Sequence, residues 1–279
     1  ICSSKHEYPV WFSRNGRVDL MSYKVLSDGS VTSAEGFLAS GMHSGIKKSF
    51  RKFDVSLIYS ETPAISAGVF TTNKVKAWPL DHDIHVMKNR YHRAIFANSG
   101  NANCFNGPSG KKAVQVSLDL VSRHLGFSKK EIFVASTGII GREFPTDNIM
   151  KAIPVLVQNL ARSGGHDAAR GILTTDTKPK EIAVRFTVDG KAVTVGGMAK
   201  GAGMLYPNMT ADGKASGQKH ATMLCYVTTY LNISKPMLQK ALIKATEASF
   251  NRIAIDNDQS TNDMVIVLAN GKAGNRPIV

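Results

Sequence analysis

The chain has 279 residues, of which 43% are hydrophobic and 20% are charged, so it can bury a substantial core. Its 35 lysines and arginines against 21 acidic residues give a net charge of +14. The basic residues are dispersed and form only short clusters, which disfavours nucleic acid as a partner and favours a basic surface that steers anionic substrates. No stretch approaches the about 18 apolar residues of a membrane-spanning helix, and three cysteines without a C-x-x-C spacing indicate a reducing compartment and argue against structural zinc.

Paired strands are predicted in the first third of the chain. Residues 1–35 are treated as an N-terminal extension. Its first 20 residues lack the apolar segment of a secretory signal and are either sequence upstream of a start at Met21 or a weak transit segment. Two apolar runs, Phe53–Tyr59 and Ser66–Phe70, are separated by the breaker Pro63. We therefore expect two paired strands of a central sheet.

Two strand ends in the middle of the chain carry small polar residues. The predicted strand Arg93–Ala97 runs into Asn98–Asn103, whose amides suit a turn that presents donors to a ligand, although an Asx-rich turn without a ligand has the same composition. A second predicted strand, Ile132–Ala135, ends in Ser136-Thr137-Gly138. There a backbone N–H and a hydroxyl can point at one oxygen, as an oxyanion hole requires.

Helices and strands alternate through the rest of the chain. Asp189-Gly190 is the strongest local turn signal and predicts a hairpin. Pro154 lies inside a helical pattern, which indicates a kinked helix or two short helices. The predicted helices are Gly110–Leu125, Asp147–Ala161, His166–Leu173 and Lys235–Phe250. The further predicted strands are Ile182–Thr187, Ala192–Val195, Met223–Thr228 and Val265–Ala269.

The stretch Gly196–Thr229 has the composition of a glycine-rich loop that leads into a buried strand. Its first part is rich in glycine around Lys200, and its last part is an apolar run that begins at Ala221-Thr222. In such a stretch a strained backbone and a nucleophilic hydroxyl can coincide. Thr222 is therefore a candidate nucleophile, and an ordinary threonine at the start of a strand is the alternative.

Several separate motifs follow one another along the chain. They are Gly68-Val69-Phe70-Thr71-Thr72-Asn73, Asn98-Ser99-Gly100-Asn101-Ala102-Asn103, Ser136-Thr137-Gly138, Thr174-Thr175-Asp176-Thr177, Gly197-Met198-Ala199-Lys200-Gly201, Pro207-Asn208-Met209, Ala221-Thr222-Met223-Leu224 and Ser260-Thr261-Asn262-Asp263. Over roughly Gly36 to Ile278 the sequence thus resembles the ornithine acetyltransferase family, the self-cleaving glutamate N-acetyltransferases of cyclic arginine biosynthesis.

The resemblance implies an α/β fold of mixed β-sheets layered with helices, of the autoprocessing N-terminal-nucleophile type. It places self-cleavage at the Ala221–Thr222 bond, which divides the chain into regions 36–221 and 222–279. It implies transfer of an acetyl group from N-acetylornithine to glutamate by a ping-pong mechanism, with no cofactor and, as in some relatives, acetyl-CoA as a further acetyl donor. It also implies association of the two cleaved pieces, a homo-oligomer, and a cytoplasmic location, or the mitochondrial matrix in a fungus.

The same resemblance assigns roles to five residues. Thr222 is the nucleophile and a substrate contact, and its released α-amine, with a pKa near 8, is the base. Thr137 and Gly138 resemble the oxyanion-hole pair. Thr174 and Lys200 resemble substrate-contacting positions, and the charge of Lys200 suits a carboxylate that both substrates share. A surface lysine in a loop is the alternative for Lys200.

Two departures from the family pattern keep other outcomes open. Residues Thr210–His220 are inserted before Ala221, and this polar segment is expected to form an exposed loop. The loop either relieves the backbone strain at the scissile bond or protrudes into solvent without affecting cleavage. The sequence stops at Val279, whereas family members continue through further substrate-binding segments, so we expect a fragment or a truncated copy. The alternatives are a related self-processing amidase or aminopeptidase, which uses water as acceptor, and an unprocessed inactive protein.

Overall fold

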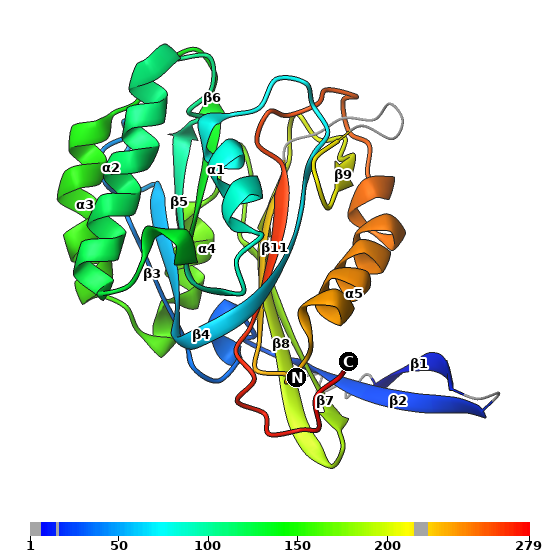
Figure 1. Ribbon diagram of the computed structural model, residues 1–279. Coiled ribbons are helices and arrows are strands. Elements are labelled where there is room, and N and C mark those ends of the chain that lie inside the picture. The colour runs from blue at the N-terminus through cyan, green and yellow to red at the C-terminus, as the bar shows by residue number, and fades with distance from the viewer. Residues whose placement is uncertain (1–6, 15–16, 215–222) are drawn as a thin grey trace.

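A mixed sheet of eleven strands organises the computed structural model, which describes residues 7–14, 17–214 and 223–279 (Figure 1). The strands are β1 (Glu7–Arg14), β2 (Arg17–Leu26), β3 (Phe37–Met42), β4 (Val55–Thr71), β5 (Tyr91–Asn101), β6 (Ile132–Ile139), β7 (Lys180–Val188), β8 (Lys191–Lys200), β9 (Met209–Thr210), β10 (Leu224–Thr229) and β11 (Met264–Ala269). The α-helices are α1 (Trp78–Val86), α2 (Gly107–Leu125), α3 (Thr146–Gln158), α4 (Gly165–Gly171) and α5 (Lys235–Ala248). Short 3-10 turns are η1 (Val31–Ser33), η2 (Lys129–Glu131), η3 (Arg162–Gly164) and η4 (Phe250–Arg252).

The strand order places the last strands of the chain in the middle of the sheet. The order is β1-β2-β7-β8-β10-β11-β4-β5-β6, and β3 and β9 both pair with β4. Two neighbouring pairs, β5–β6 and β10–β11, are parallel. The region after residue 222 therefore supplies two central strands, and the N-terminal extension continues the sheet because β2 pairs with β7.

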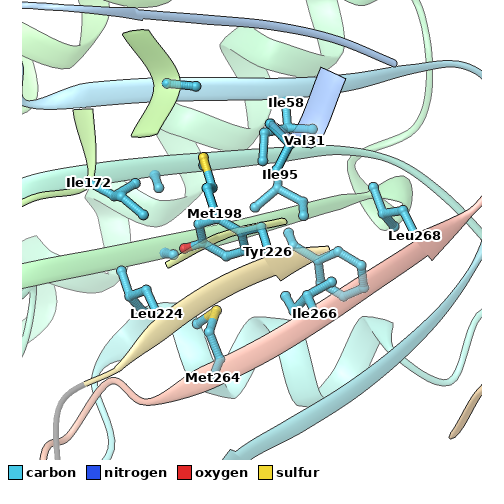
Figure 2. Packing of buried hydrophobic residues seen from close by; sticks show 14 of the residues in the cluster. Val31, Ile58, Ile95, Ile172, Met198, Leu224, Tyr226, Met264, Ile266 and Leu268 are labelled. Carbon is cyan, nitrogen blue, oxygen red and sulfur yellow. The ribbon is translucent and has the colours of Figure 1, made fainter. Parts of the chain in front are cut away.

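The central strand β11 is apolar on both faces, and so is β10 from Leu224 to Val227. Every residue of β11 is buried. Strands covered on both sides lose the alternation of polar and apolar residues that a half-exposed strand shows, so continuous apolar runs suit this place. Figure 2 shows Leu224 and Tyr226 of β10 and Met264 and Ile266 of β11 gathered in one core cluster. The labelled neighbours in that cluster are Val31, Ile58, Ile95, Ile172, Met198 and Leu268.

Helices cover different parts of the sheet. α2 and α3 lie side by side over the end formed by β4, β5 and β6, where Leu57, Phe96 and Val134 belong to the same core cluster as the apolar sides of both helices (Figure 1). α5 packs through Leu238 and Leu242 against a third cluster that contains residues of β4, β10 and β11. These layers form the predicted architecture of mixed strands and helices.

The two strands expected on either side of Pro63 are one continuous strand, β4, so the expected strand pair is wrong. The register of β4 against β5 shifts between Tyr59 and Ala64, and Pro63 lies inside this irregularity. Proline has no N–H for a ladder hydrogen bond, and a bulge is a place where the ladder is interrupted. The strand therefore continues past the proline and then pairs with β11 and β9.

The glycine-rich stretch is strand up to Lys200, so its expected loop conformation is wrong for that part. Gly196 and Gly197 lie within β8, which pairs with β7 on one side and β10 on the other. A Cβ on Gly196 would lie 2.1 Å from the carbonyl oxygen of Ser30. Glycine here allows the backbone before η1 to pack directly on the strand.

Most other expected elements are present with shifted ends. α3 is one helix that contains Pro154 rather than two short helices. The sequence does not predict β1, β2, β3, β9 or α1. The sequence of α1, WPLDHDIHV, lacks a clean apolar stripe. Within the described part of the chain, no helix combines the length and the apolar character that crossing a bilayer requires.

Candidate active site

A pocket of about 760 Å³ opens where β5, β6 and β8 end. The start of β10 lies beside it, because Leu224 pairs with Lys200. The pocket is lined by Ile46, Lys47, Lys48, Ser49, Lys52, Gly100, Thr137, Gly138, Ile139, Arg142, Thr174, Thr175, Lys200, Gly203 and Met204. The four predicted site residues that the structure describes are all in this lining.

Lys200 joins two of these residues. Only 2% of its surface is exposed, and its Nζ donates to the hydroxyl of Thr137 at 3.2 Å and to that of Thr174 at 2.9 Å. Burial lowers the pKa of Lys200, while the charges of Asp176 and Asp263 act to raise it. The structure therefore brings together residues from β6, the segment after α4 and the end of β8, and Lys200 is a buried strand residue rather than a surface lysine in a loop.

Gly138 occupies a place that only glycine fits. Its φ of +134° lies in the region that residues with a Cβ rarely adopt. A Cβ there would lie 2.4 Å from the carbonyl carbon of Gly100 and 2.6 Å from the nitrogen of Asn101. The β5 and β6 backbones thus approach closely at the edge of the pocket, where the register of their pairing is irregular.

Asp176 holds the backbone next to Lys200. Its carboxylate accepts the N–H of Gly201 at 2.8 Å and a hydrogen bond from Lys180 at 2.5 Å. Burial works to raise the pKa of Asp176, but the Lys180 ammonium, the Gly201 N–H and the charge of Lys200 hold it below its ordinary value. The Thr174–Thr177 motif contains Asp176, yet its sequence gives no sign that the carboxylate reaches the end of β8.

A buried carboxylate shapes a further loop that lines the pocket. Asp54 is fully buried and accepts the backbone N–H groups of Ser44 at 2.5 Å and Lys47 at 2.9 Å. The Lys47 ammonium donates to the carbonyl oxygens of Phe53 and Leu173, each at 2.6 Å. Burial lowers the pKa of Lys47 to about 8, against the opposing charge of Asp54. The loop is thereby fixed against the segment before Thr174.

The pocket is strongly basic. Its lining holds five cationic side chains and, among the described residues, no carboxylate. Lys48, Lys52 and Arg142 are exposed, whereas Lys47 and Lys200 are engaged in the contacts given above. The three exposed cations are therefore free to meet an anionic ligand. In the sequence Lys48 and Lys52 belong to one short cluster of basic residues, and Arg142 is an isolated arginine, so neither pattern indicates a site.

Ala221 and Thr222, the predicted cleavage site and nucleophile, lie outside the described residues. The next residue, Met223, is buried and held on both sides: its N–H donates to the carboxylate of Asp263, and its carbonyl accepts the N–H of Met264 at 3.0 Å. Burial raises the pKa of Asp263 well above its usual range, although the Met223 N–H and the charge of Lys200 act against this. The chain thus re-enters the described structure at a fixed point next to the pocket.

The fold is found in known enzymes. An L-aminopeptidase D-Ala-esterase/amidase from Ochrobactrum anthropi, described as a variant of the Ntn hydrolase fold, matches 87% of this chain and 74% of its own with a TM-score of 0.52 and 12% identity. Identity this low shows the fold alone. It confirms the predicted α/β fold of the N-terminal-nucleophile type.

The chain belongs to the ArgJ family, whose sequence model matches residues 38–278. It is 48% identical over 250 residues to the glutamate N-acetyltransferase of Methanocaldococcus jannaschii, covering 88% of this chain and 58% of that protein. An ornithine acetyltransferase from Mycobacterium tuberculosis, solved in complex with ornithine, matches 67% of this chain and 100% of its own with a TM-score of 0.63 and 36% identity. The chain spans about three fifths of the length of the curated relatives it matches. The predicted family is confirmed.

Proposed function

We propose that this protein transfers an acetyl group from N-acetylornithine to glutamate in arginine biosynthesis, through an acetyl-enzyme formed on Thr222. The observation that carries the proposal is the convergence of Thr137, Gly138, Thr174 and Lys200 on one basic pocket beside the start of β10. Membership of the ArgJ family and the likeness to a glutamate N-acetyltransferase support it.

Self-cleavage comes first in this proposal. The Thr222 hydroxyl attacks the carbonyl carbon of Ala221, the C–N bond between the two residues breaks, and the acyl group moves from nitrogen to oxygen. The hydroxyl proton passes to the nitrogen, which becomes the free α-amine of Thr222. Water then hydrolyses the resulting ester, which releases the Ala221 carboxylate and restores the Thr222 hydroxyl. Met223, which follows Thr222 in the sequence, is held by its contacts with Asp263 and Met264. Regions 36–221 and 222–279 are then separate pieces, whose strands lie interleaved in one sheet.

Acetyl transfer follows in two halves. The α-amine of Thr222, with an ordinary pKa of about 8, takes the hydroxyl proton as the oxygen attacks the acetyl carbonyl of N-acetylornithine. The developing oxyanion accepts hydrogen bonds from the Thr137 hydroxyl and the Gly138 N–H. Ornithine leaves with the proton, and the amine of glutamate attacks the acetyl-enzyme in the same site. Acetyl-CoA is a further acetyl donor in this scheme, and no other cofactor takes part.

The charge of the pocket suits these substrates. N-acetylornithine and glutamate both carry an α-carboxylate, and the exposed cations Lys48, Lys52 and Arg142 line the pocket near Thr174 and Lys200. A pocket of one sign raises the local concentration of ligands of the opposite sign. We further propose a homo-oligomer in the cytoplasm, in line with the family resemblance.

Two measurements test the function. Intact mass spectrometry of the purified chain is expected to show two pieces separated at Ala221–Thr222, and Thr222→Ala is expected to remain whole. Incubation with N-acetylornithine and glutamate is expected to yield N-acetylglutamate with parallel lines in a double-reciprocal plot. Acetate in place of N-acetylglutamate would make the protein a hydrolase, and a whole, inactive wild type would contradict the proposal.

A further inference from the structure

We infer that Lys200 is a positioning residue of the oxyanion hole, which aims and strengthens the Thr137 hydroxyl as a donor. This inference rests on the proposed function and deepens it. It gives Lys200 a role exerted through Thr137, whereas the family resemblance suggests direct contact with a substrate carboxylate.

The first step of the argument is the hydrogen-bond chemistry of the two side chains. An ammonium group can only donate, whereas a threonine hydroxyl has one proton and two acceptor lone pairs. Because Lys200 donates to the Thr137 oxygen at 3.2 Å, the hydroxyl proton cannot point at Lys200. Among the described residues, Lys200 is also the hydrogen-bond partner found for each of the Thr137 and Thr174 hydroxyls. Both hydroxyl protons are thus left for a ligand in the pocket that these residues line.

The second step is the electrostatic state of the ammonium. Lys200 is buried, and within the described part of the chain it forms no ion pair, so its hydrogen bonds go to neutral hydroxyls. The nearby carboxylate of Asp176 is bound by Lys180 and the Gly201 N–H instead. In a buried site a charge acts more strongly on its neighbours than it does in water. The ammonium therefore polarises the hydroxyl O–H bonds and makes them better donors.

The third step is the consequence for the reaction. A polarised Thr137 hydroxyl interacts weakly with a neutral acetyl carbonyl and strongly with the negative oxygen of the tetrahedral intermediate. The proton stays on Thr137, so no bond is made or broken at Lys200. Its contribution appears as charge develops, and a change at Lys200 should lower kcat rather than raise KM. If Lys200 instead bound a substrate carboxylate directly, its replacement should raise KM and leave kcat almost unchanged.

A double-mutant cycle separates the two roles. Lys200→Met and Thr137→Val are made singly and together, and kcat and KM are measured for N-acetylornithine and glutamate. We expect Lys200→Met to lower kcat by about 10-fold or more, but by no more than the about 100- to 1,000-fold typical of a lost oxyanion donor, with KM almost unchanged. In the Thr137→Val background the same change should have almost no further effect, because the group through which it acts is gone. Thr137→Ser, which keeps the hydroxyl, should restore the Lys200 dependence.

Other outcomes overturn the inference. Multiplicative losses in the cycle would show that Lys200 acts independently of Thr137, and a higher KM for both substrates would assign it to their carboxylates. Lys112→Met, at an exposed position on α2, controls for the loss of one positive charge. Thermal denaturation of every variant separates loss of fold from loss of activity.

A measurement that needs no turnover keeps the inference testable if the proposed function fails. Carbon-13 NMR of the lysine ε-carbons, assigned with Lys200→Met, follows the titration of Lys200. We expect its pKa to fall further in Thr137→Val, because the ammonium loses an acceptor while burial remains. An unchanged titration would refute the Lys200–Thr137 contact. A wild type that makes no N-acetylglutamate but shows this shift would refute the acetyl-transfer proposal alone.

Discussion

Replacement of Gly138 by alanine tests the close approach of β5 and β6 at the pocket. The added methyl group would meet backbone atoms of the neighbouring strand, the carbonyl carbon of Gly100 at 2.4 Å and the nitrogen of Asn101 at 2.6 Å. Ordinary van der Waals contact begins at about 3.4 Å. Because the obstacles are backbone atoms of a paired strand, the strands must separate by roughly 1 Å, and no side-chain rotation relieves the contact.

The expected cost combines two effects. Holding alanine at a φ of +134° costs about 1–3 kcal/mol. Overpacking against a strand adds about 1–3 kcal/mol, so the free energy of unfolding should fall by about 2–6 kcal/mol. Gly141 provides a matched control three residues later, since its φ is +77° and nothing lies within 4 Å of an added Cβ. Gly141→Ala should cost only the about 1–2 kcal/mol of left-handed backbone.

Urea denaturation followed by circular dichroism measures the difference between the two variants. Gly138→Ala should unfold at a clearly lower urea concentration than Gly141→Ala, with a similar m-value. If the proposed function holds, acetyl transfer should also fall, because displacement of the β6 backbone moves the Gly138 N–H away from the proposed position of the oxyanion. Equal stability of the two variants would refute the reasoning, because it would mean that the strands accommodate a methyl group at this point.

Local sequence patterns predict those elements whose cause is local. The Asp189-Gly190 turn and the apolar run Val265–Ala269 correspond to the β7–β8 hairpin and to β11. The Ser136-Thr137-Gly138 motif likewise lies where a strand end meets a pocket. In each case the residues themselves determine the backbone conformation or the burial.

Patterns whose cause is a distant contact mislead the prediction. Pro63 reads as a strand breaker, but β4 continues because β5 pairs with it on both sides of an irregularity. Gly196 reads as part of a loop, whereas its lack of a Cβ serves the approach of Ser30, which is far away in sequence. In both cases the contacting residues lie far away in the sequence, outside the short stretch that a sequence pattern covers. A prediction from sequence therefore treats the proline and the glycine as loop residues.

The candidate site shows the same limit for side chains. The motifs make Lys200 a candidate site residue, but its positive charge alone suggests a ligand carboxylate. Its burial and its two hydroxyl partners, Thr137 and Thr174, depend on three segments that meet only in the fold. Asp54 and Asp176 are missed for the same reason, since each acts on backbone N–H groups beyond its own turn or strand.

Two buried titratable groups give opposite predictions for the dependence of stability on pH. Asp83 is fully buried, accepts the Val134 N–H at 2.9 Å, and has its pKa raised well above the usual range by burial. Because the pKa of Asp83 is higher in the folded chain than in the unfolded chain, its contribution to the free energy of unfolding is full below the unfolded pKa and is lost as pH rises. Asp83→Asn should therefore stabilise the protein at pH 8 relative to wild type and lose that advantage near pH 4, as measured by urea midpoints. A constant difference at both pH values would contradict this. His92 behaves in the opposite sense, because burial lowers its pKa to about 4 while one ring nitrogen contacts Ser66 Oγ at 2.7 Å and the other Val86 O at 2.9 Å. The carbonyl can only accept, so Nε2 carries the proton and Nδ1 accepts from the serine in a neutral ring. As pH falls from about 6.5 to about 4 the unfolded chain gains a proton that the folded ring does not, which removes about 3 kcal/mol of the free energy of unfolding. In His92→Gln this part of the fall in the free energy of unfolding with decreasing pH should disappear. If the variant and the wild type showed the same pH dependence between pH 6.5 and 4, the ring would have to be protonated in the folded chain without loss of its contacts.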